Sequence, residues 1–272
     1  MPANCELRTL AADAAASYAG PIYQTPLEAL SAKASLVFWG DDWGEDPTFV
    51  VASGAVSEWT SRVGSTKYEQ TTATKRPTYV ANGSASLLRG RPYAEFNGVV
   101  SSSGSRMAPA GGLSPLTPGQ AYTVLDIIRP DSVATTQYLT GQVGASNDAI
   151  AAYVSAASGG LINHRYGNAI ASISLAGLTN TWLPVLYAYD GASTITLICN
   201  GETDTATVTV APTTARAFTM GSISAGNDAG VMDGAWAARM RWSEYILSDA
   251  DYFATLRAYI QAAFGFSSDL LA

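Results

Sequence analysis

Charge is scarce in this sequence of 272 residues, and acidic residues outnumber basic ones. Only 14% of the residues are Asp, Glu, Lys or Arg, against about a quarter in an average globular chain. Ser, Thr, Asn, Gly and Ala must therefore form much of the surface, as in an ordinary neutral β-protein or in a subunit that its neighbours partly cover. The net charge of −7 repels phosphate backbones, which excludes general nucleic-acid binding.

Cysteine is nearly absent, with only Cys5 and Cys199. No Cys-x-x-Cys pair occurs, which excludes a cysteine-rich structural zinc site. A disulfide between the two stays open, although Cys199 lies in an expected strand and is better explained as a small buried hydrophobe. So few cysteines are typical of a protein that folds in a reducing compartment.

Long apolar runs are missing as well. No stretch of about 18 apolar residues occurs, so we expect no transmembrane helix and no membrane insertion. Residues 1–20 have neither the basic segment nor the apolar segment of a secretory signal peptide. We therefore expect synthesis in the host cytoplasm, with release by lysis or by assembly into a particle.

What the sequence does have is a strand pattern: short β-branched and aromatic runs separated by Gly, Ser, Asn and Asp. Asn97-Gly98 and Asn200-Gly201 are strong turn signals. The pattern predicts an all-β antiparallel sandwich or barrel from Leu36 onward, with Trp39, Trp59, Trp182, Trp236 and Trp242 in its core. The expected strands are residues 36–39, 56–63, 93–96, 121–129, 137–143, 149–154, 161–166, 182–189, 194–199, 203–210, 218–222 and 234–245, with 149–154 and 161–166 forming a hairpin.

The N-terminal segment, residues 1–35, is rich in Ala and differs from the strand region. A short helix is predicted over residues 25–33, because Thr25 and Glu28 have the spacing of a capping box. We interpret the segment as an arm. It packs on its own domain, reaches a neighbouring subunit, or is disordered, and the sequence leaves these alternatives open.

The C-terminal segment predicts a helix over residues 249–264 that packs on the sandwich. Ser248 is the expected N-cap and Gly265 the expected C′ residue. Phe253, Leu256, Ile260 and Phe264 recur at helical spacing and form an apolar stripe. Residues 267–272 are then a C-terminal tail.

A catalytic site is not predicted. Glycosidases need two carboxylates that flank the bond, but Glu58 and Glu95 each stand alone on an expected strand, where a polar side chain on the outer sheet face is the simpler interpretation. The single histidine, His164, has no nucleophile elbow beside it, and we expect a surface or half-buried strand residue.

The acidic loop that follows the first strand holds the candidate metal ligands. Asp41, Asp42, Glu45 and Asp46 are oxygen donors in a loop that contains Gly44, the chemistry that calcium prefers. No other cofactor is expected, and a solvated acidic loop is the alternative. Trp43 lies in the same loop and is a candidate platform for stacking on a sugar ring.

Four motifs in order resemble the concanavalin A-like lectin/glucanase superfamily in its laminin-G-like form. They are residues 36–42 with 56–59, residues 71–79 with 90–98, residues 181–201, and residues 234–251 with the following helix. The resemblance covers residues 36–266 and implies a jelly roll of the kind found in phage and prophage virion proteins and in secreted adhesins. Fold alone does not define function.

The resemblance and the missing signal peptide together favour a non-enzymatic structural protein of a phage-like virion, such as a decoration, spike or fibre component. Its expected partners are other virion subunits, bound through residues 1–35, in a homo-oligomer such as a trimer. Contact with cell-surface glycans is compatible with this role. The alternatives are a carbohydrate-binding adhesion module and, less favoured, a glycoside hydrolase.

Overall fold

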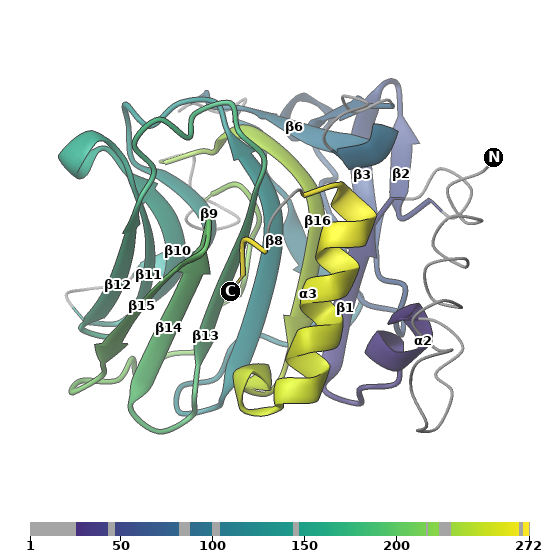
Figure 1. Ribbon diagram of the computed structural model, residues 1–272. Helices are drawn as coiled ribbons and strands as arrows, with labels where there is room; N and C mark the ends of the chain where they lie inside the picture. Colours follow the sequence, from purple (N-terminus) through teal and green to yellow (C-terminus); the bar gives the residue numbers. More distant parts are fainter. Residues whose placement is uncertain are drawn as a thin grey trace.

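A computed structural model describes residues 26–42, 47–81, 88–99, 104–143, 147–215, 217–222, 230–266 and 269–271. Within these ranges the chain forms two antiparallel sheets packed face to face, with a C-terminal helix on the outer face of the larger sheet (Figure 1). The predicted all-β sandwich with a packed C-terminal helix is confirmed. None of the described helices is long and apolar enough to span a membrane.

The larger sheet has twelve described strands in the order β15-β14-β13-β8-β16-β6-β5-β3-β4-β7, with β1 paired to β16 and β2 to β3. Its centre is made of long strands rich in apolar and β-branched residues, which favour extended structure. The strands are β1 (Leu36–Asp41), β2 (Phe49–Ala52), β3 (Ala55–Thr60), β4 (Lys67–Glu69), β5 (Thr78–Val80), β6 (Tyr93–Asn97), β7 (Ala108–Ala110), β8 (Tyr122–Pro130), β13 (Leu183–Tyr189), β14 (Thr194–Cys199), β15 (Glu202–Thr207) and β16 (Asp233–Trp242).

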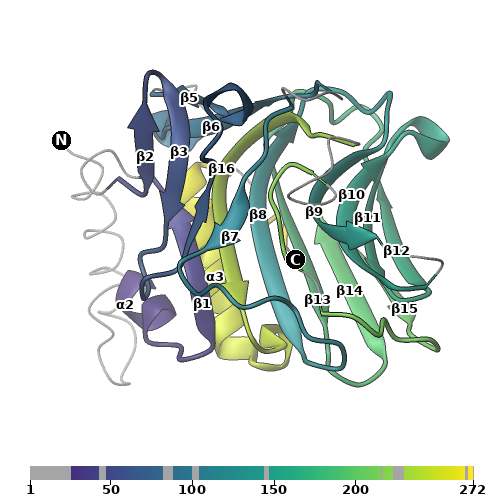
Figure 2. The ribbon, with the colours of Figure 1, turned by 180° about the vertical axis from the view of Figure 1, so that it is seen from behind.

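The smaller sheet has the order β12-β11-β10-β9 and lies over β13–β15, as the view from behind shows (Figure 2). Its strands are β9 (Gln137–Val143), β10 (Ala149–Ser155), β11 (Leu161–Tyr166) and β12 (Ala169–Ser174). The predicted hairpin is confirmed, with Ile150 opposite Tyr166 and Ser155 opposite Leu161. Side chains on these strands alternate between the sandwich interior and the outer face, as the pleat requires.

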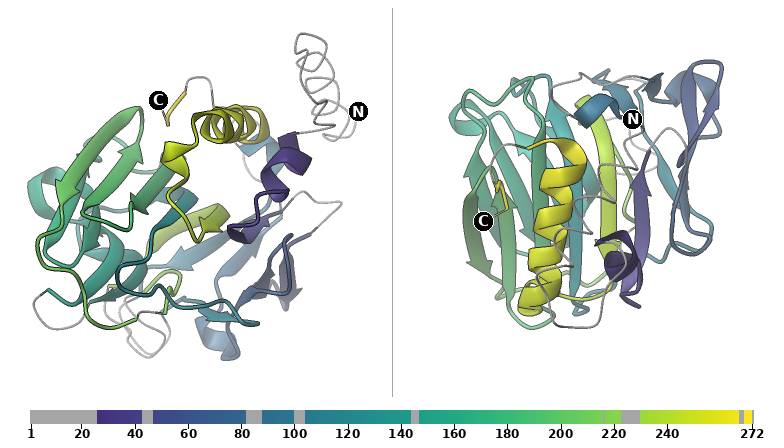
Figure 3. Two further views of the ribbon diagram at one scale, coloured as in Figure 1. Left: turned by 90° about the horizontal axis from the view of Figure 1, so that it is seen from below. Right: turned by 45° about the vertical axis from the view of Figure 1, so that its right-hand side comes forward.

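The buried apolar side chains form two cores on opposite faces of the large sheet. Trp59 and Trp236 lie in the core between the sheets. Trp39, Trp182 and Trp242 lie in the second core, beneath the C-terminal helix, which Figure 3 shows on the side away from the smaller sheet. All five tryptophans predicted to be buried are buried, and so is the free thiol of Cys199.

The C-terminal helix α3 spans Ala250–Phe264 and closes the second core. Its N-cap is Asp249, whose side chain accepts a hydrogen bond from the backbone N–H of Tyr252 at 3.1 Å. The predicted N-cap, Ser248, instead ends a short 3₁₀ turn, Ile246–Ser248, and donates to the carbonyl of Tyr245. Gly265 takes the expected left-handed conformation after the last turn, at φ 74°.

Helix α2, Pro26–Ser31, packs against α3 in the same chain. Leu30 is fully buried in the second core, and its carbonyl accepts a hydrogen bond from the hydroxyl of Tyr252 at 3.1 Å. Lys33 pairs with Glu244 and Asp249. The predicted arm, as far as it is described, therefore lies on its own domain. Residues 1–25 lie outside the described part of the chain.

The end of the chain also packs against the domain. Leu271 is buried in the second core, Asp269 pairs with Arg257 of α3, and the carbonyl of Leu270 accepts from the N–H of Gly201.

The strand predicted over residues 218–222 is wrong. Only isolated bridges form there, from Met220 to Met107 and to Thr140. Gly221, at φ 75°, interrupts the extended backbone that a longer ladder needs. The segment is a connection between the sheets whose apolar residues are buried without being in a strand.

Candidate functional site

Asp41, the first candidate calcium ligand, is fully buried and already paired. It forms an ion pair with Arg62, lies 3.7 Å from Nη1 of Arg91, and accepts a hydrogen bond from the hydroxyl of Tyr259 in α3. Burial alone raises the pKa of Asp41, but the two guanidinium groups and the hydrogen bond from Tyr259 together outweigh it, so the pKa is lowered. This carboxylate joins β1 to α3, a structural role.

The rest of the acidic loop is only partly described. Asp42 is buried and accepts from the backbone N–H of Phe49 at 3.4 Å. Trp43, Glu45 and Asp46 lie outside the described residues, so the calcium site and the sugar platform remain predictions. Across the described ranges, no group of three or more His, Cys, Asp or Glu side chains is placed to hold a metal ion.

The two isolated carboxylates considered for catalysis form surface ion pairs. Glu58 lies 3.1 Å from Nζ of Lys67, which also contacts Glu69. Glu95 lies 3.1 Å from Nη2 of Arg129. Both glutamate side chains are partly exposed, at 36% and 39%, which agrees with their interpretation as polar side chains on an outer sheet face.

His164 is fully buried, so the prediction of a surface or half-buried strand histidine is wrong. It shares one face of β11 with Ile162 and Tyr166, and alternation therefore directs it into the sandwich. Nδ1 lies 3.3 Å from the carbonyl of Thr196 and Nε2 lies 2.8 Å from the hydroxyl of Tyr122. Burial lowers the pKa of His164 to about 3, so the ring is neutral at pH 7.

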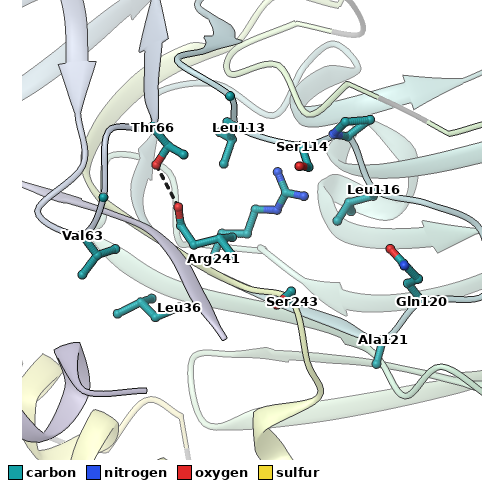
Figure 4. A pocket seen from close by; sticks show the side chains of 14 residues that line it. Leu36, Val63, Thr66, Leu113, Ser114, Leu116, Gln120, Ala121, Arg241 and Ser243 are labelled. Carbon is teal, nitrogen blue, oxygen red and sulfur yellow. Dashed lines mark hydrogen bonds between the residues drawn. The ribbon is translucent and has the colours of Figure 1, made fainter. Parts of the chain in front are cut away.

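A pocket of about 480 Å³ opens at the end of the sandwich where β1 begins and β16 ends (Figure 4). The loop between β7 and β8 forms one wall. The lining is mixed: apolar side chains suit the faces of a ring, and hydroxyl and amide groups suit its substituents. The lining residues are Leu36, Val37, Val63, Gly64, Thr66, Gly112, Leu113, Ser114, Pro115, Leu116, Gln120, Ala121, Arg241 and Ser243.

Arg241 is the one ionisable side chain among these lining residues. It pairs in register with Phe38 and Val124, which places its side chain on the interior face of the large sheet. The side chain is 3% exposed, and Figure 4 shows the guanidinium extending toward the loop that carries Leu113, Ser114 and Leu116. Within the described structure, neither Nε nor Nη1 of Arg241 has a hydrogen-bond partner.

The neighbouring buried carboxylate is already used by another arginine. Asp126 accepts from Nε and Nη2 of Arg239 at 2.7 and 2.8 Å, from Trp236 at 3.0 Å and from Tyr187 at 2.9 Å. Burial lowers the pKa of Arg241, and Arg239 acts in the same direction, whereas the phenols of Tyr68 and Tyr187 oppose them. Because an arginine does not lose its proton in a protein, the pocket floor carries a positive charge. The Arg241 guanidinium lies 5.8 Å from the centre of the Phe218 ring and near the phenol of Tyr68, and it pairs with no carboxylate among the described residues.

Sequence reasoning assigned the segment around Arg241 to a core strand and missed the pocket. The available signal was the pair Arg239 and Arg241, two residues apart and therefore on one face of a strand that two core tryptophans flank. Each of two arginines on an interior face would be stabilised by a carboxylate of its own. The sequence could not show that Asp126 pairs with Arg239 and not with Arg241.

A second candidate contact surface lies on the outer face of the smaller sheet. Tyr138 and Tyr153 are directly opposite on β9 and β10, with ring centroids 5.4 Å apart. Both rings are half-buried, and Arg165 of β11 lies close enough to act on both phenols. Paired aromatic rings beside polar groups are a surface on which a sugar ring can stack.

No family model and no curated protein matches the sequence. Among solved structures, a mutant GH54 α-L-arabinofuranosidase soaked with 4-nitrophenyl α-L-arabinofuranoside is 11% identical, with a TM-score of 0.54 over 80% of this chain and 53% of that one. Domain 4 of AbnA, a GH43 extracellular arabinanase from Geobacillus stearothermophilus, in complex with arabinotriose, is 13% identical, with a TM-score of 0.48 over 80% of this chain and 98% of that one.

A third similar structure is the CBM40 of the IT-sialidase of Ruminococcus gnavus, bound to α2,3-sialyllactose. It is 15% identical, with a TM-score of 0.40 over 50% of this chain and 82% of that one. Identities this low carry information about fold and not about activity. The two-sheet architecture and the similarity to the arabinofuranosidase show that the chain has a jelly-roll β-sandwich fold.

Proposed function

We propose that the protein is a non-enzymatic, glycan-binding jelly-roll module whose ligand occupies the pocket floored by Arg241. The observation that carries this proposal is the lining of the pocket: hydroxyl and amide groups alternate with apolar walls, and none of the described lining residues is Asp, Glu or His. Such a lining can bind a polyhydroxylated ligand but offers no acid–base pair for glycoside hydrolysis.

Ser114 provides the test, because it is exposed and lies at the pocket wall. We expect the wild-type protein to bind on a glycan array and S114W to bind at least about tenfold more weakly, because the indole occupies the ligand's place. T117W is the matched control: Thr117 is exposed on the same loop and is not part of the lining, so its binding should be unchanged.

Three outcomes contradict the proposal. If the wild-type protein binds no glycan, the function is wrong. If S114W binds normally and Y153A does not, the ligand lies on the tyrosine surface of the smaller sheet. If mass spectrometry finds a bound glycan cleaved, the protein is an enzyme.

We also propose that the protein is a component of a phage-like virion and that it assembles through residues 1–25. The low surface charge and the sequence resemblance support it. Light scattering should find the full chain oligomeric and a chain that begins at Pro26 monomeric. The cut belongs at Pro26 because a chain that begins at Leu36 loses Leu30 from the second core. Two monomers would rule out assembly through this segment.

A further inference from the structure

The interior of the sandwich beside the pocket has an unbalanced charge. Arg239 and Arg241 contribute two positive charges, and Asp126 contributes one negative charge that Arg239 binds with both oxygens. Asp126 and Arg239 are fully buried and Arg241 nearly so. Arg241 has the ring of Phe218 and the phenol of Tyr68 as neighbours but no described carboxylate, and a buried charge without a counter-charge is expensive, since water no longer solvates it. An anionic ligand bound in the pocket would supply the missing counter-charge.

We infer that the pocket binds its glycan through an acidic group of the sugar, a carboxylate that pairs with the guanidinium of Arg241. This inference rests on the proposed function and names the class of its ligand. The planar, forked guanidinium matches a carboxylate in geometry. The excess of one positive charge matches a monoanion better than a phosphate monoester, which carries nearly two negative charges at pH 7.

The remaining lining fits the rest of a sugar acid. Thr66, Ser114, Gln120 and Ser243 provide hydroxyl and amide groups around the guanidinium, and they can donate to or accept from ring hydroxyls. Thr66 already donates to the carbonyl of Val37 at 2.8 Å, which fixes its side chain at the pocket wall. Leu113 and Leu116 flank the guanidinium and shield an ion pair there from water, which strengthens it.

The test compares D-glucuronate with D-glucose, two sugars that differ in a carboxylate at one carbon. We expect glucuronate to raise the melting temperature of the full chain in a concentration-dependent way, and glucose to raise it much less. Acetate, a carboxylate without a sugar ring, should also raise it less than glucuronate at equal concentration. Equal shifts with acetate and glucuronate overturn the assignment to a sugar acid.

Two variants of Arg241 separate a ligand-binding role from a structural one. R241M keeps the volume and removes the charge, so without ligand it should melt no lower than the wild-type protein, and its response to glucuronate should disappear. R241K keeps the charge but not the fork, and its affinity for glucuronate should fall about tenfold or more. If R241M melts well below the wild-type protein and R241K binds glucuronate normally, Arg241 is structural and the inference is wrong.

These results also separate the inference from the function on which it rests. Binding of neutral glycans that S114W abolishes, with no preference for glucuronate over glucose, leaves the glycan-binding function standing and overturns the acidic ligand. Glucuronate binding that R241M abolishes supports both.

Discussion

Replacing Asp126 with alanine is expected to lower the free energy of unfolding by about 3–5 kcal/mol, a large share of the ~5–15 kcal/mol that is typical of a native domain. Asp126 and Arg239 are both fully buried, and four hydrogen bonds converge on the two oxygens of Asp126. Burial alone lowers the pKa of Arg239, and the charge of Asp126 raises it. Without Asp126, Arg239 and Arg241 lie two residues apart on the interior face of β16, and neither pairs with a described carboxylate.

Asp131 offers a matched control for this substitution. It accepts two hydrogen bonds from one guanidinium, at 2.6 and 2.9 Å from Arg129, just as Asp126 does from Arg239. The pair on Asp131 is partly exposed, and Arg129 also contacts Glu95. D131A should therefore cost at most about 1 kcal/mol. Urea denaturation at pH 7 measures both variants, and equal losses would show that burial is not what makes the Asp126 pair important.

The double variant D126L/R239M tests the same reasoning from the other side. Replacing both partners of a buried ion pair with apolar residues removes the unpaired charge, and it is often neutral or stabilising. We expect the double variant to recover most of the stability that D126A loses. If the double variant loses as much stability as D126L and R239M lose in sum, the two side chains do not act as a pair.

The fold was predictable from the sequence where strands are long and apolar. Strands β9, β11 and β14 begin and end where the sequence placed them, because β-branched runs between Gly, Asn and Asp turns leave little freedom. Strands β2, β4, β5 and β7 were missed, because a three- or four-residue strand is too short to show a period. Strand β12 was missed because its inward side chains are mostly small, as in Ala169 and Ala171.

The candidate site was much less predictable than the fold. The sequence could suggest ligands only where polar residues are neighbours along the chain, as in Asp41 and Asp42. The structure shows that Asp41 is occupied by Arg62 and Tyr259, which are distant in the sequence. Arg241, in contrast, has no carboxylate opposite it on the neighbouring strand β8. The strand register is the reason, because Asp126 lies opposite Arg239 and Val124 lies opposite Arg241.

His164 should make the protein sensitive to mild acid. The carbonyl of Thr196 can only accept, so Nδ1 carries the proton and Nε2 accepts from the hydroxyl of Tyr122. Both contacts suit the neutral ring. Burial lowers the pKa of His164 in the folded protein to about 3, whereas an unfolded histidine has a pKa near ~6.5.

The sign of the effect follows from proton binding. Between about pH 6.5 and pH 3 the unfolded chain binds a proton at this residue and the folded protein does not, so falling pH favours unfolding. The contribution of His164 to the free energy of unfolding is fully present above about pH 6.5. It declines by about 1.4 kcal/mol for each pH unit below that. The expected loss between pH 6.5 and 4.5 is roughly 2–3 kcal/mol.

H164Q isolates the contribution of this residue. Glutamine can still accept a hydrogen bond from Tyr122 but does not titrate, so the free energy of unfolding of H164Q should change much less between pH 6.5 and 4.5. Urea denaturation at half-unit pH intervals gives both slopes, and only their difference matters, because every other titrating group is common to the two proteins. Carboxylates with a lowered pKa, such as Asp41, act at lower pH in both. If the two proteins lose stability at the same rate over this interval, the buried neutral ring is not the source of the acid sensitivity. His164 then either takes up a proton in the folded state or is reached by solvent.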